Sequence, residues 1–363
     1  MLSSMTTATR ITRWDRCDIV VLCAPLARPN VGSKELRRVK KRRINGPEGG
    51  MTVTHHLARW LLAPMFVALM MSGLEVPAYG QRPYYATPPP GSSPTPMRPY
   101  GQSGGCSEEP AVLHRCGLEK AKTFNPPRTP DGRPNFQGFW FRIGARNAEN
   151  IEEHPEGIDG SGGKSLIVDP PNGRIPYQPW AAAKVATHWA TYWNPVQQCM
   201  PDSPPRQAYA AGAMQIIQTP GLVLVLAEQL HTYRAIPTDA RPHIPSNIHL
   251  FMGDSRGRWE GNTLVVDVTN LKDRVWLDHV GNVYSETVHV VERWTMFHEE
   301  VIHYQATIDD PEVFTRPWTM AFGWRRNTEP GFELLESACW EGVQDGQQRL
   351  KNELKVYPGK FGK

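Results

Sequence analysis

The stretch of residues 258–339 most constrains the fold of this 363-residue chain, because it consists of short β-strand patterns separated by turn residues. The Gly261-Asn262 pair is typical of a tight turn, and residues 264–268, just after it, are mostly β-branched. Four more strand patterns follow, over residues 286–295, 301–308, 318–324 and 332–338. No helical stretch of comparable length separates them, as parallel crossovers require, so we expect an antiparallel sheet.

Strand patterns also precede this stretch. They cover residues 134–140, 214–218, 222–226 and 231–236. Gly138 and Trp140 in the first of them are spaced as in the Gly-x-Trp signature of lipocalins. Because many short strands at regular intervals are typical of sandwiches and barrels, we predict an all-β, antiparallel up-and-down (lipocalin-like) barrel. One short helix is expected over residues 181–193, where apolar residues repeat at helical spacing.

The first third of the chain differs in composition from the rest. Residues 1–50 hold eleven Lys and Arg against four Asp and Glu. They are either a basic nucleic-acid-binding arm or an extension upstream of a true start at Met51. The second interpretation is favoured, because a complete export signal follows Met51. Weakly basic residues there precede an apolar stretch at 60–71, and small residues stand at the cleavage site, Ala78-Tyr79-Gly80.

We therefore expect a signal peptide over residues 51–80 and a mature protein in the periplasm or outside the cell. The apolar stretch is shorter than the roughly 20 residues that span a bilayer, so no stable membrane insertion is expected after cleavage. A Pro/Gly/Ser-rich tether, expected to be disordered, follows over residues 81–128. The barrel domain is predicted over residues 129–345, and residues 346–363 form a C-terminal tail.

The charge of the mature part argues against nucleic acid as a partner. The chain carries a formal net charge of +4, but residues 1–50 contribute +7, which leaves −3 for the remaining 313 residues. Domains that bind nucleic acid present a basic surface, and none is expected here. The expected partner is a small-molecule ligand.

Several motifs occur together and in a characteristic order. They are TPDGRP at 129–134, GFW at 138–140, QTPG at 218–221, GRWEGNTLVV at 257–266 and TRPWT at 315–319. On these motifs, residues 129–341 resemble a family of exported bacterial proteins of uncharacterised activity. The resemblance implies a lipocalin-like β-barrel and a location outside the cytoplasm. It implies no reaction and no catalytic residue.

The predicted mature chain contains Cys106, Cys116, Cys199 and Cys339. In an exported protein an even number of cysteines indicates disulfides, and four cysteines allow three connectivities. The simplest joins Cys106 to Cys116 and Cys199 to Cys339. No metal site is expected, because no Cys-x-x-Cys spacing occurs and the histidines lack a tightly spaced pair.

Candidate catalytic side chains gather in two connections between strands. The first, residues 238–257, is longer than most loops of a compact domain, and such loops are often functional. The second is the Asp278-His279 loop. The candidates for proton transfer are His243, His249, Asp254, Asp278 and His279. We predict that they lie with Arg241 at one end of the barrel; the alternative is that the first loop only covers that end and its histidines are solvated.

Arginine, tryptophan and histidine side chains in or near the strands are candidates for ligand binding. They are Arg234, Arg241, Trp259, His289, His303 and Trp318. Because guanidinium binds carboxylates and stacks on rings, they favour an apolar or aromatic-carboxylate ligand in the barrel mouth. In the alternative interpretation the two histidines are hydrogen-bonded or solvated wall residues, and the arginines pair with acidic residues. Those acidic residues are Glu260, Asp267, Glu286 and Glu292.

Three functions are compatible with these patterns: ligand binding in the barrel mouth, an extracytoplasmic hydrolase, lyase or isomerase that uses His and Asp, and a structural envelope protein. No cofactor is expected, because no Gly-x-Gly-x-x-Gly follows a predicted strand and the full phosphate-binding loop pattern is absent. A serine hydrolase is not expected either. A polar cavity with two histidines would favour the enzyme, an apolar cavity the binding protein, and a filled interior the structural role.

Overall fold

The computed structural model describes residues 99–144, 150–154, 162–339 and 354–361, all within the compact unit Pro77–Lys363. The predicted basic extension, the signal peptide and the tether up to residue 98 lie outside these residues, as does most of the predicted C-terminal tail.

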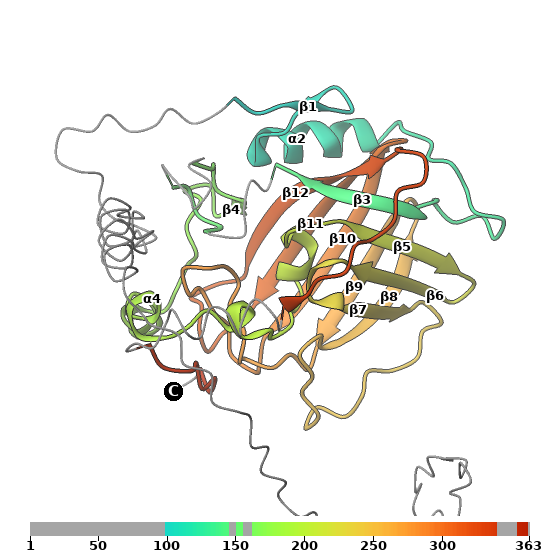
Figure 1. Cartoon of the computed structure of the whole chain (residues 1–363). Helices are drawn as coiled ribbons and strands as arrows, with labels where there is room; N and C mark the ends of the chain where they lie inside the picture. The colour runs from blue at the N-terminus through green and yellow to red at the C-terminus, as the bar shows by residue number, and fades with distance from the viewer. Residues whose placement is uncertain (1–98, 145–149, 155–161, 340–353, 362–363) are drawn as a thin grey trace, which may run out of the picture. The chain divides into compact units, whose positions relative to one another are not determined.

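The described residues form a ten-stranded sheet that curls into a nearly closed barrel (Figure 1). Its path runs β7-β6-β5-β3-β12-β11-β10-β9-β8, with every neighbouring pair antiparallel, and β4 (Ile167–Asp169) pairs with β12 outside this path. The strands of the path are β3 (Gly138–Ile143), β5 (Met214–Thr219), β6 (Leu222–Ala227), β7 (Tyr233–Pro237), β8 (Asp254–Glu260), β9 (Thr263–Thr269), β10 (His289–His298), β11 (Val301–Asp309) and β12 (Trp318–Asn327). The predicted all-β antiparallel barrel is confirmed.

The barrel closes between β7 and β8, the two ends of this path. Arg234 of β7 donates a hydrogen bond from Nε to Ser255 Oγ of β8 at 2.8 Å. Close approach at this seam depends on Gly257, because a Cβ there would lie 2.8 Å from Thr238 and 2.9 Å from Ile236. Side-chain contacts therefore join β7 and β8, which the backbone hydrogen bonds of the sheet do not pair.

Alternation along each strand separates the inside of the barrel from its outer wall. In β10, Val290, Glu292 and Trp294 are buried in the interior, whereas His289 and Arg293 point outward and are partly exposed. The interior is dominated by aromatic rings: Trp294 and Trp324 meet edge to face at 4.9 Å between ring centroids, and Tyr304 lies 5.0 Å from Trp324.

A segment of the chain itself fills the remaining interior. Residues 202–210, which include the short 3-10 helix η2 (Arg206–Tyr209), are all buried. Tyr209 packs edge to face on Phe322 at 5.7 Å, and Trp324 Nε1 donates to the carbonyl of Ala208 at 2.8 Å. Because Phe322 and Trp324 point into the barrel, residues 202–210 form an internal plug.

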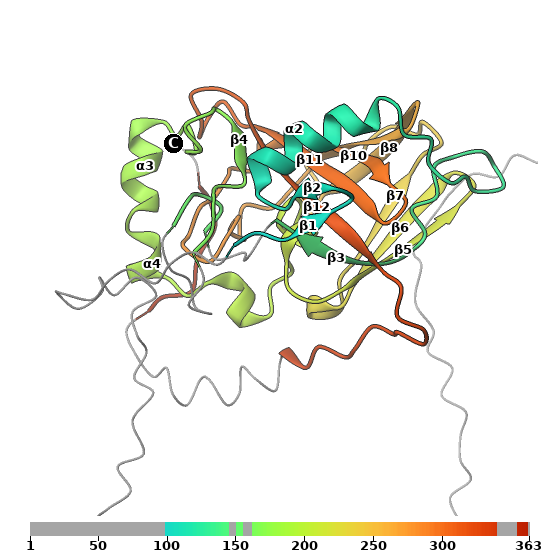
Figure 2. The ribbon, with the colours of Figure 1, turned by 90° about the horizontal axis from the view of Figure 1, so that it is seen from above.

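Two helical regions differ from expectation. The predicted helix over 181–193 is present but interrupted, as α3 (Pro179–Val185) and α4 (His188–Thr191), and His188 at the start of α4 contacts the carbonyl of Gly281. The stretch expected to be a tether contains two short strands, β1 (Gln102–Ser103) and β2 (Cys106–Ser107), and the helix α2 (Pro110–Ala121). Figure 2 shows α2 lying across β10, β11 and β12. Few residues of α2 are buried, so its sequence shows little of the apolar periodicity that predicts a helix.

The strand expected over residues 332–338 is absent. Both edges of β12 are already occupied, by β3 and β11, so the following segment has no strand to pair with. It is held by side chains instead, with Phe332 edge to face against Phe139 and Phe141 at 5.1 and 5.5 Å.

Both expected disulfides are present. Cys106 is bonded to Cys116, ten residues away, and Cys199 to Cys339, 140 residues away. Among the described residues, none of the helices has the length and apolar character needed to cross a bilayer.

Candidate functional sites

The largest group of partly exposed titratable side chains lies on the outer wall, across β8, β9 and β10. His243, from the loop before β8, places Nδ1 2.6 Å from Asp254 Oδ2. Asp267 Oδ1 lies 3.1 Å from Nε2 of His243 and 3.1 Å from Nε2 of His289. Arg256 completes this wall cluster through a 2.7 Å contact between Nη1 and Asp254 Oδ1.

The hydrogen bonds of the wall cluster set its charge state. The bond from Asp267 raises the pKa of His289, and the same bond lowers the pKa of Asp267. His289 therefore holds a proton more readily than a free histidine does. Within the part of the chain that the structure describes, no group of three or more His, Cys, Asp or Glu side chains has the arrangement needed to hold a metal ion.

Asp278 and His279 lie elsewhere. Asp278 is fully buried and accepts hydrogen bonds from the backbone of Ile151 and Asn282 and from the Asn282 side chain, the last at 2.6 Å. Burial raises its pKa to about 6. Burial, with Arg206 and Arg142 nearby, lowers the pKa of His279 to about 3. Asp278 thus organises the loop that covers this end of the barrel.

The predicted catalytic set is therefore divided. Of its five members, the structure joins His243 to Asp254 on the outer wall, while Asp278 and His279 belong to the buried end and His249 is half-buried further along the long loop. That loop runs along the wall, since β7 ends at the opposite end of the barrel from the start of β8. The contact between His243 and Asp267 was not predicted, because His243 lies in an irregular loop and no periodic pattern in the sequence shows where its side chain points.

The predicted ligand-binding residues also separate. Arg234 is buried in the barrel, where Nη1 and Nη2 lie 3.0 and 2.8 Å from the two carboxylate oxygens of Glu292. Tyr304 donates to the same carboxylate at 2.7 Å. Arg241 pairs with Asp239 at the surface, at 2.5 Å. Acidic partners for these arginines agree with the second interpretation of the sequence.

Of the four remaining members of that set, His289 belongs to the wall cluster, and the other three lie apart from one another. Trp259 is half-buried against Phe136, with 5.5 Å between ring centroids. Trp318 is fully buried and packs edge to face on Phe314 at 5.6 Å. His303 is only 1% exposed and lies under α2. No common ligand site is formed by these side chains.

The chain does contain the Gly-x-Ser-x-Gly pentapeptide of a serine nucleophile, in Gly253-Asp254-Ser255-Arg256-Gly257 and in Gly101-Gln102-Ser103-Gly104-Gly105. A nucleophile elbow needs the serine at a sharp turn from strand to helix. Ser255 instead lies within β8, with its hydroxyl bound to Arg234 inside the barrel, and His243 is on the outer wall. Ser103 lies in β1 and donates to Glu108 at 2.7 Å. Neither serine is placed for acyl transfer.

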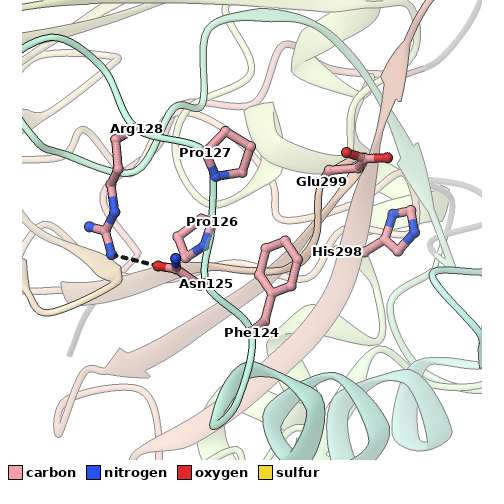
Figure 3. Close-up of a pocket in the computed structure, with 7 residues that line it drawn as sticks. All are labelled: Phe124, Asn125, Pro126, Pro127, Arg128, His298 and Glu299. Atoms are coloured by element: carbon pink, nitrogen blue, oxygen red, sulfur yellow. Dashed lines mark hydrogen bonds between the residues drawn. The ribbon is translucent and has the colours of Figure 1, made fainter.

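A pocket of about 460 Å³ lies outside the barrel, where the chain leaves α2 and passes the turn between β10 and β11 (Figure 3). It is lined by Phe124, Asn125, Pro126, Pro127, Arg128, His298 and Glu299. Figure 3 shows the ring of Phe124 between the prolines and His298, with Arg128 at one side and Glu299 at the other. No sequence pattern predicted this pocket, because residues 124–128 fall in the expected tether.

The guanidinium of Arg128 in this pocket is held by neutral partners. Arg128 Nη2 donates to Asn262 Oδ1 at 2.7 Å, and Nη1 donates to the carbonyl of Gly132 at 3.3 Å. No ion pair among the described residues includes Arg128 or Glu299. A guanidinium oriented by amides keeps its charge available to an anion.

Comparison of the chain with protein-family models and with curated proteins gave no match.

Proposed function

We propose that this chain is an exported β-barrel protein, related to the family its motifs resemble, that binds a small carboxylate with an apolar or aromatic body in the Phe124–Glu299 pocket. The observation that carries the proposal is the contrast between the two candidate places. The barrel mouth contains the plug of residues 202–210, whereas the outer pocket combines apolar rings with a charged guanidinium.

The chemistry of the lining supports this ligand class. Phe124, Pro126 and Pro127 offer an apolar surface, and the exposed guanidinium of Arg128 offers a positive charge for a carboxylate. The volume of about 460 Å³ falls within the range of small-molecule sites. The ligand would rest its ring on Phe124 and direct its carboxylate to Arg128.

A panel of simple probes tests this. Thermal unfolding of the mature chain is measured with benzoate and phenylacetate, and with benzyl alcohol and benzamide as uncharged counterparts. A ligand at 100 times its Kd stabilises by about 2.7 kcal/mol. We expect the carboxylates to raise Tm more than the uncharged probes, and Arg128→Ala to abolish the difference, since a hydrogen bond to a charged group contributes about 1.5–3 kcal/mol.

Arg316→Ala is the matched control, because Arg316 is also an exposed arginine but pairs with Asp169 outside this pocket. It should leave the shift unchanged. Equal responses of the Arg128 and Arg316 variants would place the site elsewhere.

The export part of the proposal has its own support and test. Two disulfides suit an oxidising compartment. N-terminal sequencing of the protein from its native host should find a mature end at or near Gln81. An intact segment containing residues 40–43 would contradict cleavage.

The wall cluster favours a second candidate, an extracytoplasmic enzyme that moves protons with His243 and His289. Its support is the shared contact of both imidazoles with Asp267. A screen of hydrolase and isomerase substrates with wild type and His243→Ala distinguishes it. Turnover that the variant lacks would establish the enzyme in place of the binding protein.

A further inference from the structure

Two histidines far apart in the sequence meet beneath α2. His114 Nδ1 lies 3.1 Å from His303 Nε2, and the rings are tilted with 5.1 Å between centroids. His303, on β11, is 1% exposed. A hydrogen bond between two imidazoles needs one nitrogen as donor and the other as acceptor, so it forms when both rings are neutral and is lost when both facing nitrogens carry a proton.

Among the described residues, no hydrogen bond or ion pair joins a carboxylate to this pair. In the sheet, His303 stands between Thr295 of β10 and Gly323 of β12, neither of which is charged. The charged groups of the packed elements lie further out: Arg115 is the neighbour of His114 on α2, His298 ends β10, and Glu108 contacts Arg325 of β12 at 3.6 Å.

Electrostatics therefore oppose proton uptake. Burial, followed by His114, lowers the pKa of His303 to about 3. Burial and then Arg115 lower the pKa of His114. Both rings gain a proton more easily when exposed to water, where histidine titrates near its ordinary value.

The packing of α2 is separate from the main core of the barrel. A small satellite cluster holds the helix, formed by Cys106, Leu113, Ile143, Phe297 and Val301. Phe297 fits against Gly117, where a Cβ would lie 3.1 Å from its ring. The Cys106–Cys116 disulfide ties α2 to β2 and not to the barrel wall. Loss of this cluster would leave the large interior core in place.

The ligand pocket is formed by the segments next to α2 and β11, the two elements that the histidine pair joins. The chain leaves α2 at Ala121 and reaches Phe124 three residues later, and the β10–β11 turn that bears Glu299 leads directly into β11 and His303. Movement of α2 away from the wall therefore pulls on the segment that leads to Phe124, whose carbonyl also accepts a hydrogen bond from Asn262 Nδ2 at 3.4 Å.

From this geometry we infer that His114 and His303 form an acid-sensitive latch, whose protonation releases α2 from the barrel wall and opens the Phe124–Glu299 pocket. The effect on the pocket rests on the proposed function, whereas release of the helix does not. Since each histidine is neutral when latched, the latch is fully closed above about pH 6.5 and weakens as pH falls towards the lowered native values. Opening increases about tenfold per pH unit for each histidine that gains a proton.

Hydrogen–deuterium exchange of the mature chain, without ligand, tests the latch directly. Rates for the backbone amides of α2 and of β10–β11 are compared from pH 7 to pH 3, after correction for intrinsic exchange. We expect α2 to lose protection at a higher pH than the strands. His303→Gln and His114→Gln each remove one titrating ring and keep an amide that can form a hydrogen bond. In both variants, the loss of protection in α2 should depend less steeply on pH.

His231→Gln is the control, because this exposed histidine bonds Ser337 far from α2. Simultaneous loss of protection in α2 and the strands, or the same pH profile in all four proteins, would overturn the latch. Because two different variants are measured, the test still decides if one of them does not fold. Probe binding to the pocket is measured separately at pH 7, so a failed ligand proposal does not affect this result.

Discussion

Arg234 and Glu292 form a bidentate ion pair inside the barrel, with 3.0 and 2.8 Å between their nitrogen and oxygen atoms. Both are almost fully buried, at 4% and 0% exposure of their side chains. The pair joins β7, at the seam, to β10 on another part of the wall. It therefore contributes to the closure of the barrel as well as satisfying two charges that water does not reach.

Breaking this pair should be costly. Glu292→Gln leaves the guanidinium buried without a counter-charge, and we expect the free energy of unfolding to fall by about 3–5 kcal/mol. Urea denaturation measures the change. Glu260→Gln, which removes a carboxylate from the exposed contacts with Arg258 and Arg293, is the control and should change stability by less than about 1 kcal/mol. Equal effects would show that Arg234 is reached by solvent.

The two disulfides should differ in their contribution to stability. The Cys199–Cys339 bridge closes a loop of 140 residues and the Cys106–Cys116 bridge one of ten. On the chain-entropy model, replacing the first pair by serine costs about 5 kcal/mol and the second about 3 kcal/mol. Denaturation of both double variants under oxidising conditions checks the order. A larger loss for the shorter loop would mean that strain or unfolded-state structure dominates.

The contribution of the wall cluster to stability should change with pH. Since Asp267 raises the pKa of His289, the imidazolium stabilises the native state below the ordinary pKa of histidine, and this contribution disappears as pH rises through the raised native value. In NMR titrations, Asp267→Asn should lower the pKa of His289 towards that of a free histidine. Asp309→Asn, which removes only a smaller through-space effect, should lower it less. No change in the Asp267 variant would exclude the hydrogen bond.

Gly281 supplies a test of the buried end. Its φ is +100°, and a Cβ would lie 2.6 Å from His188 Cβ. Gly281→Ala therefore combines a strained backbone with a clash, and we expect a loss of about 2–4 kcal/mol. Gly261→Ala is the comparison, because φ there is +58° and nothing lies within 4 Å; it should cost about 1–2 kcal/mol. Thermal unfolding of the two variants gives the difference.

Most strands of the barrel and both disulfides followed from local patterns, whereas the strand expected over residues 332–338 is absent. The β9 and β11 segments alternate with turns between them, and the cysteines leave few connectivities to choose from. The site residues did not follow in the same way. Asp267 meets His243 only because an irregular loop crosses the outer wall, and Phe124 lines a pocket only because an unexpected helix precedes it. Such contacts depend on tertiary packing and leave no periodic signal in the sequence.

The plug has a consequence for the order of folding. Residues 202–210 are made before β5 to β12, yet Ala208 is bonded to Trp324, 116 residues later, and Arg206 to the carbonyl of Trp276, 70 residues later. The buried contacts of this segment are therefore complete only when the last strand of the barrel is in place. Contacts of such long range make folding slow, and the exposed strands remain vulnerable to aggregation until these contacts form.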